Sequence, residues 1–147
     1  DLLRTAVRAE KISEVAAEFD GIHDIPRAVE VGSVDAARMK TMAAILRDPY
    51  PVHWDREANA ALGLAGRVVN QGPLNLSYIA NMLMAWAGPS SIRRLTVRYG
   101  RPVLDGDHVV AGGQVVEVVD GVAHCDIWLH RGDEEVVSGT ALVTAPS

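Results

Sequence analysis

The chain has 147 residues, a hydrophobic fraction of 48%, a charged fraction of 22% and a formal net charge of −5 at pH 7. This length predicts one globular domain, and the negative charge argues against nucleic acid or an anionic membrane as the main partner. The single cysteine, Cys125, excludes an internal disulfide and favours a cytoplasmic setting. No apolar run reaches the roughly 20 residues of a membrane span.

The first part of the chain predicts a helix, a turn and a short strand. Residues 1–19 place apolar side chains at helical spacing, which predicts an amphipathic helix that either covers the domain or meets a second subunit. A polar turn follows, in which we expect His23 to be solvated, and residues 28–31 predict a short strand. The expected organisation is an N-terminal helix and linker over residues 1–27, followed by one domain over residues 28–147.

The next segment predicts a helix that ends in a rigid elbow. Ser33 is the predicted N-cap, with Asp35 in the first turn, and an apolar stripe that includes Met39 indicates packing on the core. Pro49 and Pro51 prevent this helix from continuing, because proline fixes its own φ angle and restricts the residue before it.

Asp48 and His53 lie on either side of these prolines. A rigid elbow can aim a carboxylate and an imidazole at one water or one substrate proton, as general acid–base catalysis requires. The alternative is an ordinary loop with a surface acid and a histidine that serves only the fold. Short pairs of this kind are common, so the segment alone does not establish a site.

A short helix and a long helix follow the elbow. Asp55 is the predicted N-cap of the short helix, which ends near Gly63. After a loop, Gly72 and Pro73 precede the most apolar helix in the sequence, predicted over residues 74–87. This helix is apolar on most sides, which indicates burial, and a glycine at its start lets a ligand approach free backbone N–H groups.

From residue 92 onward, polar and apolar residues alternate, which predicts a run of strands. Short turns between them favour antiparallel meander pairing. Gly112-Gly113 predicts a bulge or close packing against the buried helix. The strands are expected at residues 92–99, 109–119, 122–129 and 135–144. Together with the long helix they predict an α+β fold.

No common metal or nucleotide motif occurs in the sequence, so we expect neither a metal ion nor a cofactor. His124 and His130 share a strand face but lie roughly 20 Å apart along it, too far to chelate one ion. Cys125 has apolar neighbours along its strand and is predicted to lie in the core.

Arg93, Arg94, Arg98 and Arg101 form the basic cluster of the sequence. They form either a solvated strand face or a contact for the phosphates of a nucleotide-bearing ligand, since arginine pairs with phosphate in a bidentate manner.

The segment from Asp48 to Gly72 resembles the MaoC-like family of (R)-specific enoyl-CoA hydratases, which have the hotdog fold, an antiparallel sheet wrapped around a long central helix. That family carries Asp-x-Asn-Pro-aliphatic-His, followed further along by a glycine that opens the central helix. Asp48, Pro51, Val52 and His53 match the motif, and Gly72 matches the glycine.

A narrower likeness is to the small hydratase subunit that actinobacteria use in steroid side-chain degradation. It is carried by Arg47-Asp48, Val69-Asn70 and the run from Trp86 to Ser90. That subunit pairs with a different MaoC-like chain in a heterotetramer, and the resemblance implies that the chain with the Asp/His pair is the catalytic one. Three features depart from the family. Tyr50 replaces the motif's Asn, and Gln71 replaces a His before the glycine. The small polar residue that many members place about two turns into the central helix has no obvious counterpart at Ile79-Ala80-Asn81.

The resemblance implies hydration of a trans-2-enoyl thioester, with acyl-CoA as substrate and no cofactor. Asp48 and His53 would hold and activate the water as one coupled pair. The backbone N–H of Gly72 would stabilise charge on the thioester oxygen. For Asn70 a plain turn role stays open. The predicted substrate-binding residues are Asn70, Gln71, Arg94 and Arg98.

Three other functions stay open, namely a non-catalytic acyl-CoA-binding partner subunit, a 3-hydroxyacyl-ACP dehydratase and a hotdog thioesterase. Residues 74–87 contain no Asp or Glu, which disfavours a thioesterase, whose usual acid lies on the central helix. The resemblance implies a second hotdog subunit as partner, identical or a different MaoC-like chain, because the ligand tunnel of the fold runs along the interface.

Overall fold

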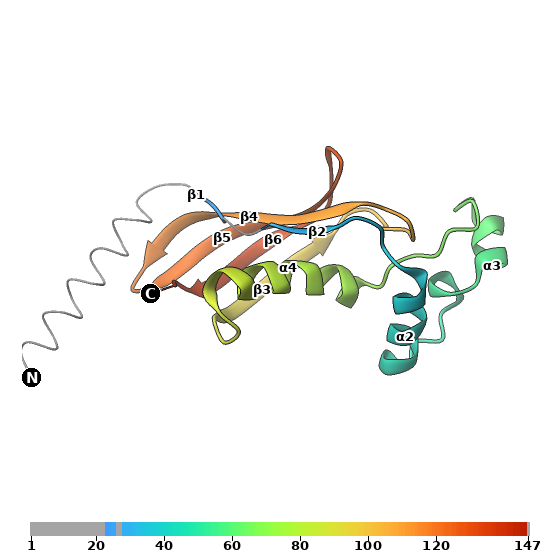
Figure 1. Ribbon diagram of the computed structural model, residues 1–147, viewed down its shortest axis with the longest axis horizontal. Helices are drawn as coiled ribbons and strands as arrows, with labels where there is room; N and C mark the ends of the chain where they lie inside the picture. The colour runs from blue at the N-terminus through green and yellow to red at the C-terminus, as the bar shows by residue number, and fades with distance from the viewer. Residues whose placement is uncertain (1–22, 26–27, 147) are drawn as a thin grey trace, which may run out of the picture.

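The computed structural model describes residues 23–25 and 28–146, and the helix predicted over residues 1–19 lies outside this part of the chain. The described residues form a six-stranded antiparallel sheet with one long helix, α4 (Gly72–Ala87), along one face (Figure 1). Two shorter helices, α2 (Ala36–Leu46) and α3 (Arg56–Ala61), lie beyond one end of the sheet, next to the N-terminal end of α4.

The strand order is β1-β4-β5-β6-β3, and β2 also pairs with β4. The strands are β1 (His23–Asp24), β2 (Val29–Val31), β3 (Ile92–Tyr99), β4 (Val109–Val119), β5 (Val122–Arg131) and β6 (Glu134–Thr144). The sequence predicts the four long strands to within two residues. Residues 23–24 also belong to the sheet, although the sequence predicts a turn there and places the domain boundary after residue 27.

The pairing of β3 differs from the predicted meander. β4, β5 and β6 pair in chain order through tight turns, whereas β3 pairs with β6 at the far edge of the sheet. A long connection over residues 100–108 carries the chain from β3 to β4, so no tight turn holds these two strands together. Among the described residues, β3 therefore has a neighbouring strand on one side only.

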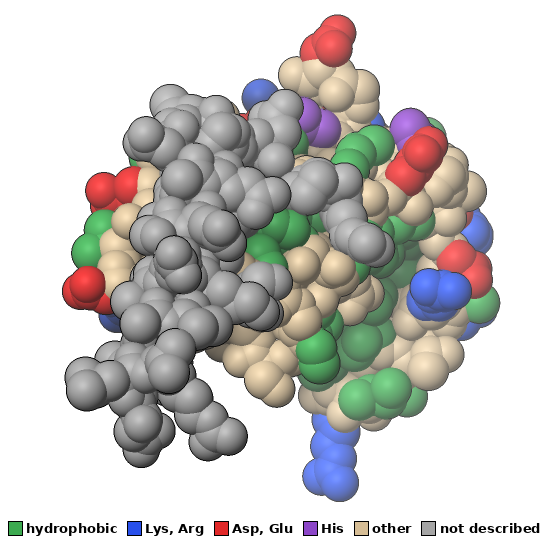
Figure 2. All heavy atoms as spheres, turned by 60° about the vertical axis from the view of Figure 1, so that its left-hand side comes forward, with side chains coloured by type: hydrophobic (Ala, Val, Ile, Leu, Met, Phe, Trp, Pro, Cys, Tyr) green, Lys and Arg blue, Asp and Glu red, His purple; other side chains and the backbone are tan. Residues whose placement is uncertain are grey.

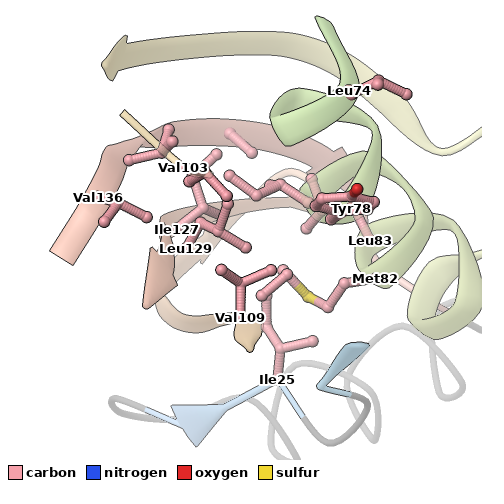
Figure 3. Packing of buried hydrophobic residues seen from close by; sticks show 14 of the residues in the cluster. Ile25, Leu74, Tyr78, Met82, Leu83, Val103, Val109, Ile127, Leu129 and Val136 are labelled. Atoms are coloured by element: carbon pink, nitrogen blue, oxygen red, sulfur yellow. The ribbon is translucent and has the colours of Figure 1, made fainter. Parts of the chain in front are cut away.

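The core lies between α4 and the sheet. The α4 side chains Tyr78, Met82 and Leu83 point toward Ile127 and Leu129 of β5 (Figure 3). Met82 and Leu83 are completely buried. Full burial of one such side chain stabilises the fold by about 1.5–3 kcal/mol, so α4 is held by packing rather than by helix propensity.

Cys125 belongs to this core and is 2% exposed, as the sequence predicts. Burial, with a smaller contribution from the neighbouring carboxylate of Asp126, raises the pKa of the Cys125 thiol to about 11. The thiol is therefore neutral at physiological pH.

Gly112-Gly113 of β4 packs closely, but not against α4. A Cβ added to Gly113 would lie 2.8 Å from the carbonyl oxygen of Asp126 and 2.9 Å from Cδ1 of Ile25. The bulge of this strand lies further along, between Val115 and Glu117. The glycines thus let β5 and Ile25 approach the strand.

The start of α2 differs from its prediction by two residues. The carboxylate of Asp35 accepts the N–H of Ala37 at 2.8 Å, so Asp35 rather than Ser33 is the N-cap. Met39 is fully buried, as predicted, whereas Leu46, which helical spacing places on the same apolar stripe, is 44% exposed. In α3 the cap is the predicted one, since the Asp55 carboxylate accepts two N–H groups of the first turn.

On the face shown in Figure 2, Lys and Arg side chains are scattered among Asp and Glu side chains. This mixed surface agrees with the weak net charge of the sequence. In the part of the chain that the structure describes, no helix has the length and apolar character needed to cross a membrane.

Candidate active site

The predicted elbow connects α2 to α3 and is stabilised by local hydrogen bonds. Arg47 ends α2 in the left-handed conformation, with φ of 51°. Asp48 follows, and its Oδ1 accepts the N–H of Tyr50 at 3.1 Å. Pro51–His53 then form a single 3-10 turn, in which the N–H of His53 donates to the carbonyl of Tyr50 at 3.2 Å.

This elbow brings the predicted catalytic pair together. Asp48 Oδ2 lies 3.4 Å from His53 Nε2, and the two side chains are 36% and 13% exposed. His53 Nδ1 lies 2.8 Å from the carbonyl oxygen of Val69. Because a carbonyl oxygen only accepts, Nδ1 carries the hydrogen of this bond. His53 therefore exchanges protons at Nε2, the nitrogen that faces Asp48.

A buried asparagine, Asn59, holds the elbow in place. Its amide nitrogen donates to the carbonyl of Val52 at 2.8 Å and to that of Arg67 at 2.9 Å. The N–H of Val69 also donates to the carbonyl of Val52 at 2.9 Å. These bonds tie the residue before His53 to the loop that carries its carbonyl partner. The sequence gives no signal for Asn59, because its partners are backbone groups of two loops.

The N-terminus of α4 lies at the same place. Gly72 is the first residue of the helix, so its N–H has no acceptor within the helix. The hydroxyl of Tyr99 donates to the carbonyl of Gly72 at 3.1 Å. A Cβ on Gly72 would lie 3.1 Å from Cζ of Tyr99, so glycine allows the ring to pack on the helix start. The helix dipole favours a negative charge at this end.

A cavity of about 350 Å³ joins these groups, a size usual for small-molecule sites. It is lined by His53, Val69, Asn70, Gly72, Asn75, Tyr99, Gly100, Arg101 and Pro102. The predicted catalytic histidine, the predicted N–H donor and one predicted substrate-binding residue thus share one cavity, although His53 comes from the elbow and Asn70 and Gly72 come from the segment that starts α4.

Asn70 is 3% exposed and is fixed at both its backbone and its side chain. Its N–H donates to the carbonyl of Val103 at 2.7 Å, and its amide nitrogen donates to Asn75 Oδ1 at 2.7 Å. Its side-chain oxygen has no hydrogen-bond partner among the described residues. A buried acceptor left unpaired costs about 1–3 kcal/mol.

Gln71 does not line this cavity. Its side chain is 1% exposed, and its amide nitrogen donates to the carbonyl of Met39 at 2.8 Å. Gln71 therefore ties the start of α4 to the neighbouring helix α2. Its predicted contact with substrate stays a prediction.

Arg94 and Arg98 are not brought together with the pair. Tyr99 points toward α4, and successive residues of a strand point to opposite faces, so Arg98 and Arg94 point away from α4. Arg101 is the arginine of the basic cluster that lines the cavity, with its Nε 3.7 Å from Glu134. A phosphate contact for Arg94 or Arg98 stays a prediction.

An ionic network anchors the β3–β4 connection to the segment before α4. Asp107, 8% exposed, contacts the guanidinium of Arg67 through Oδ1 and that of Arg131 through Oδ2 at 2.8 Å. Asp105 Oδ1 accepts the N–H of Val68 at 2.6 Å. The sequence predicts only a turn here, because the arginine partners lie far away in the chain.

This network also shifts the ionisation of both acids. Burial acts to raise the pKa of Asp107, but the N–H of Leu104 and the guanidinium groups of Arg131 and Arg67 outweigh it, so the pKa is below its ordinary value. For Asp105, burial is likewise outweighed, chiefly by its hydrogen bond to Arg56, and the pKa is lowered. Both acids are therefore ionised at neutral pH.

The described residues contain no group of three or more His, Cys, Asp or Glu side chains that could hold a metal ion. The chemistry that the described site can offer is proton transfer by Asp48 and His53 and stabilisation of a negative charge by the N–H of Gly72.

Residues 15–127 match the family described as MaoC like domain. Among similar solved structures, the R-hydratase PhaJ1 from Pseudomonas aeruginosa is 21% identical, with 90% of this chain and 85% of that chain covered and a TM-score of 0.78. The (R)-hydratase from A. caviae involved in PHA biosynthesis is 24% identical, with 82% and 95% covered and a TM-score of 0.70. A chain of the ChsH1-ChsH2 complex from Mycobacterium tuberculosis is 23% identical, with 86% and 98% covered and a TM-score of 0.73.

A search of curated proteins finds no match to this sequence. The similar structures share the arrangement of sheet and central helix, and at this level of identity they establish the fold. The family match spans most of the chain, from before β1 into β5. The protein therefore belongs to the MaoC-like family of hydratases and dehydratases and has the hotdog fold.

Proposed function

We propose that the protein is a hydro-lyase that adds water across the double bond of a trans-2-enoyl-CoA and gives a 3-hydroxyacyl-CoA. The observation that carries this proposal is the 3.4 Å approach of Asp48 Oδ2 and His53 Nε2, with His53 and Gly72 lining one cavity. Each group meets one need of the reaction.

Hydration needs a water at C3, a proton at C2 and a stabilised thioester oxygen. Asp48 and His53 hold the water within hydrogen-bonding reach of both side chains, take one of its protons as hydroxide bonds to C3, and return a proton to C2. The two act as one coupled unit, so neither is assigned as the sole acid or base. The N–H of Gly72 stabilises the enolate-like oxygen, and one such donor contributes about 2.7–4 kcal/mol.

The test is the loss of enoyl-thioester absorbance with crotonyl-CoA. Asp48→Asn and His53→Ala are expected to lower kcat by about a hundredfold or more, because each removes one half of the proton-transfer pair. Asp126→Asn and His124→Ala are matched controls, because both residues lie on β5 and neither lines the cavity of His53. Asp126 is exposed, and His124 lies 3.2 Å from Glu117 of β4. Near-normal turnover by both site variants would overturn the mechanism.

We also propose that the chain works with a second hotdog subunit. Two observations support this, the one-sided pairing of β3 and the likeness to a chain of the ChsH1-ChsH2 complex. An exposed edge strand readily pairs with another chain. If the partner is a different MaoC-like chain, this chain is the catalytic member, because it carries Asp48 and His53.

Assays with and without the protein encoded by the neighbouring gene, tested as the candidate partner, distinguish a homomeric from a heteromeric enzyme. Light scattering gives the mass of each species. Turnover of crotonyl-CoA by the chain alone supports a homomeric hydratase of lipid metabolism. Turnover of only a ring-bearing enoyl-CoA, and only with the partner, supports a role in steroid side-chain degradation. Acyl-CoA binding without turnover in either case would support the non-catalytic alternative.

A further inference from the structure

The outer edge of the sheet at β3 carries a pattern of side chains that the proposed function does not use. Among the described strands, β3 pairs only with β6 (Figure 1). From Arg94 to Tyr99 its register with β6 is regular, and the strand contains no proline. Its second side therefore offers a straight row of backbone groups to which a further strand can add.

The side chains of β3 differ between the two faces of the sheet. Leu95 and Val97 point toward the core and are only partly buried there. Arg94, Thr96 and Arg98 point to the outer face, away from α4, and all three are exposed. A strand added at this edge would cover the two apolar side chains further and would lie beside the two arginines.

The charges of these arginines are not compensated in the part of the chain that the structure describes. The side chains of Arg94 and Arg98 form no hydrogen bond or ion pair there. Their neighbours across on β6, Leu142 and Ser138, are uncharged. Neither arginine lines the cavity of His53. The outer edge of β3 is thus positive, although the chain as a whole has a net charge of −5.

This positive edge disfavours a second copy of β3 as the neighbouring strand. In an antiparallel pair, residues that lie opposite each other point to the same face of the sheet. Two copies aligned about Thr96 would place each Arg94 opposite an Arg98, and like charges directly opposite are destabilising. Alignment about Leu95 or Val97 would still place arginines on the diagonal, roughly 7–8 Å apart and within reach of such long side chains.

We propose that β3 pairs with the edge strand of a different protein chain, which alternates Asp or Glu on its outer face with apolar residues on its inner face. This inference rests on the proposed second subunit and adds its chemistry. The carboxylates bind Arg94 and Arg98, since a guanidinium pairs with a carboxylate in a bidentate manner. The apolar residues cover Leu95 and Val97.

The test supplies an acidic edge on the same scaffold. The double variant Arg94→Glu/Arg98→Glu is mixed with an equal amount of wild type, and native mass spectrometry distinguishes mixed dimers from like dimers by their mass. At low ionic strength, the association constant of the mixed dimer is expected to exceed those of both like dimers by roughly tenfold, because attractive cross-strand pairs replace repulsive ones. This excess should decline as added salt screens the charges.

The matched control is Arg38→Glu/Lys40→Glu, which also replaces two exposed basic residues, on α2 instead of β3. It should mix with wild type in statistical proportions. A third variant, Arg94→Gln/Arg98→Gln, removes the positive charges without adding negative ones. In analytical ultracentrifugation it should self-associate more strongly than wild type, by roughly tenfold at low ionic strength.

Statistical mixing of Arg94→Glu/Arg98→Glu with wild type, or a mixture that stays monomeric, would overturn the acidic partner strand. Equal self-association of wild type and the Gln variant would do the same. Circular dichroism verifies that each variant is folded before it is mixed.

This proposal and the hydratase proposal fail separately, because the mixing experiment contains no substrate. Statistical mixing together with hydration of crotonyl-CoA would reject the acidic partner strand and leave the hydratase proposal standing. An excess of the mixed dimer without hydration of any enoyl thioester would do the reverse. A wild-type dimer that is insensitive to salt and to both β3 variants would keep a second subunit but reject its acidic edge.

Discussion

Several side chains around the site bind backbone carbonyl groups rather than one another. His53 contacts the carbonyl of Val69, Asn59 those of Val52 and Arg67, and Gln71 that of Met39. A backbone carbonyl is fixed by the fold of its own segment, so each bond transmits that rigidity to the site. The orientation of the His53 ring thus depends on residues that need not touch substrate.

Asn59→Ala tests this dependence. The variant removes both amide donations, so the carbonyl of Arg67 loses its side-chain donor, while that of Val52 keeps the N–H of Val69. We expect a loss of about 1–3 kcal/mol in the free energy of unfolding. Turnover should also fall, because the elbow loses its tie to the loop of Val69. Urea unfolding and kcat are measured beside Asn81→Ala, an exposed position on α4 that should change neither. An Asn59→Ala protein as stable as the control would contradict this role.

The residues of the site differ in how far the sequence predicts them. Asp48, His53 and Gly72 belong to a recognisable motif, and the structure brings His53 within 3.4 Å of Asp48 and into one cavity with Gly72. Asn59 and Gln71 are ordinary amides in the sequence. Their roles depend on carbonyl groups that only the folded chain brings near, so no local pattern can reveal them.

At the scale of elements, the start of α2 shows how a tertiary contact overrides local preference. Ser33 and Asp35 are both good capping residues. Val34 lies between them and is held in place, because its N–H donates to the carbonyl of Asp107 at 2.9 Å and its carbonyl accepts the N–H of Gly106 at 2.8 Å. The helix therefore begins only after Asp35.

Two alanine variants test whether Asp35 or Ser33 caps α2. Asp35→Ala should lower the free energy of unfolding by about 0.5–2 kcal/mol, since the N–H of Ala37 loses its acceptor. Ser33→Ala should change it by less than about 0.5 kcal/mol, because Ser33 is exposed and caps nothing. Chemical denaturation of both variants measures the difference. A larger loss in Ser33→Ala would show that the helix starts earlier.

For the strands, the sequence predicts the bounds of each strand but not all of the pairing between strands. Alternation of polar and apolar residues predicts the bounds of β3 and β4 correctly, because each strand has one buried face. It does not predict that β3 pairs with β6, since alternation records which face is buried and not which strand lies beside it. Only β4, β5 and β6 pair as their tight turns predict.

At the scale of the whole molecule, Asp105 and Asp107 connect parts of the chain that are distant in sequence. Asp107 contacts Arg67 and Arg131, and Asp105 contacts Arg56. The pKa of each acid is lowered in the folded chain, so folding is favoured while the acids are ionised. This contribution is complete above the unfolded pKa of about 3.9 and is lost as the pH falls through the folded pKa.

Asp107→Asn should therefore be less stable than wild type at pH 7, by roughly 1–3 kcal/mol, because two arginines lose their ionised partner. The difference should shrink progressively as the pH falls below about 4 and through the lowered pKa of Asp107 in the folded chain, because the wild-type acid then loses its charge. Denaturant unfolding at a series of pH values between about pH 3 and pH 7 measures this difference in stability. Asp133→Asn, in the exposed turn before β6, should show no such pH dependence. A constant difference across this range would exclude an ionic origin.

The buried thiol of Cys125 makes the protein its own reporter of ligand binding. With a pKa of about 11 and 2% exposure, it should resist a thiol reagent at neutral pH until the core opens. The labelling rate then measures the population of open molecules. A compound or subunit that binds only the folded chain must slow the labelling in proportion to its occupancy. Acyl-CoA candidates and partner chains can thus be ranked without any knowledge of the reaction.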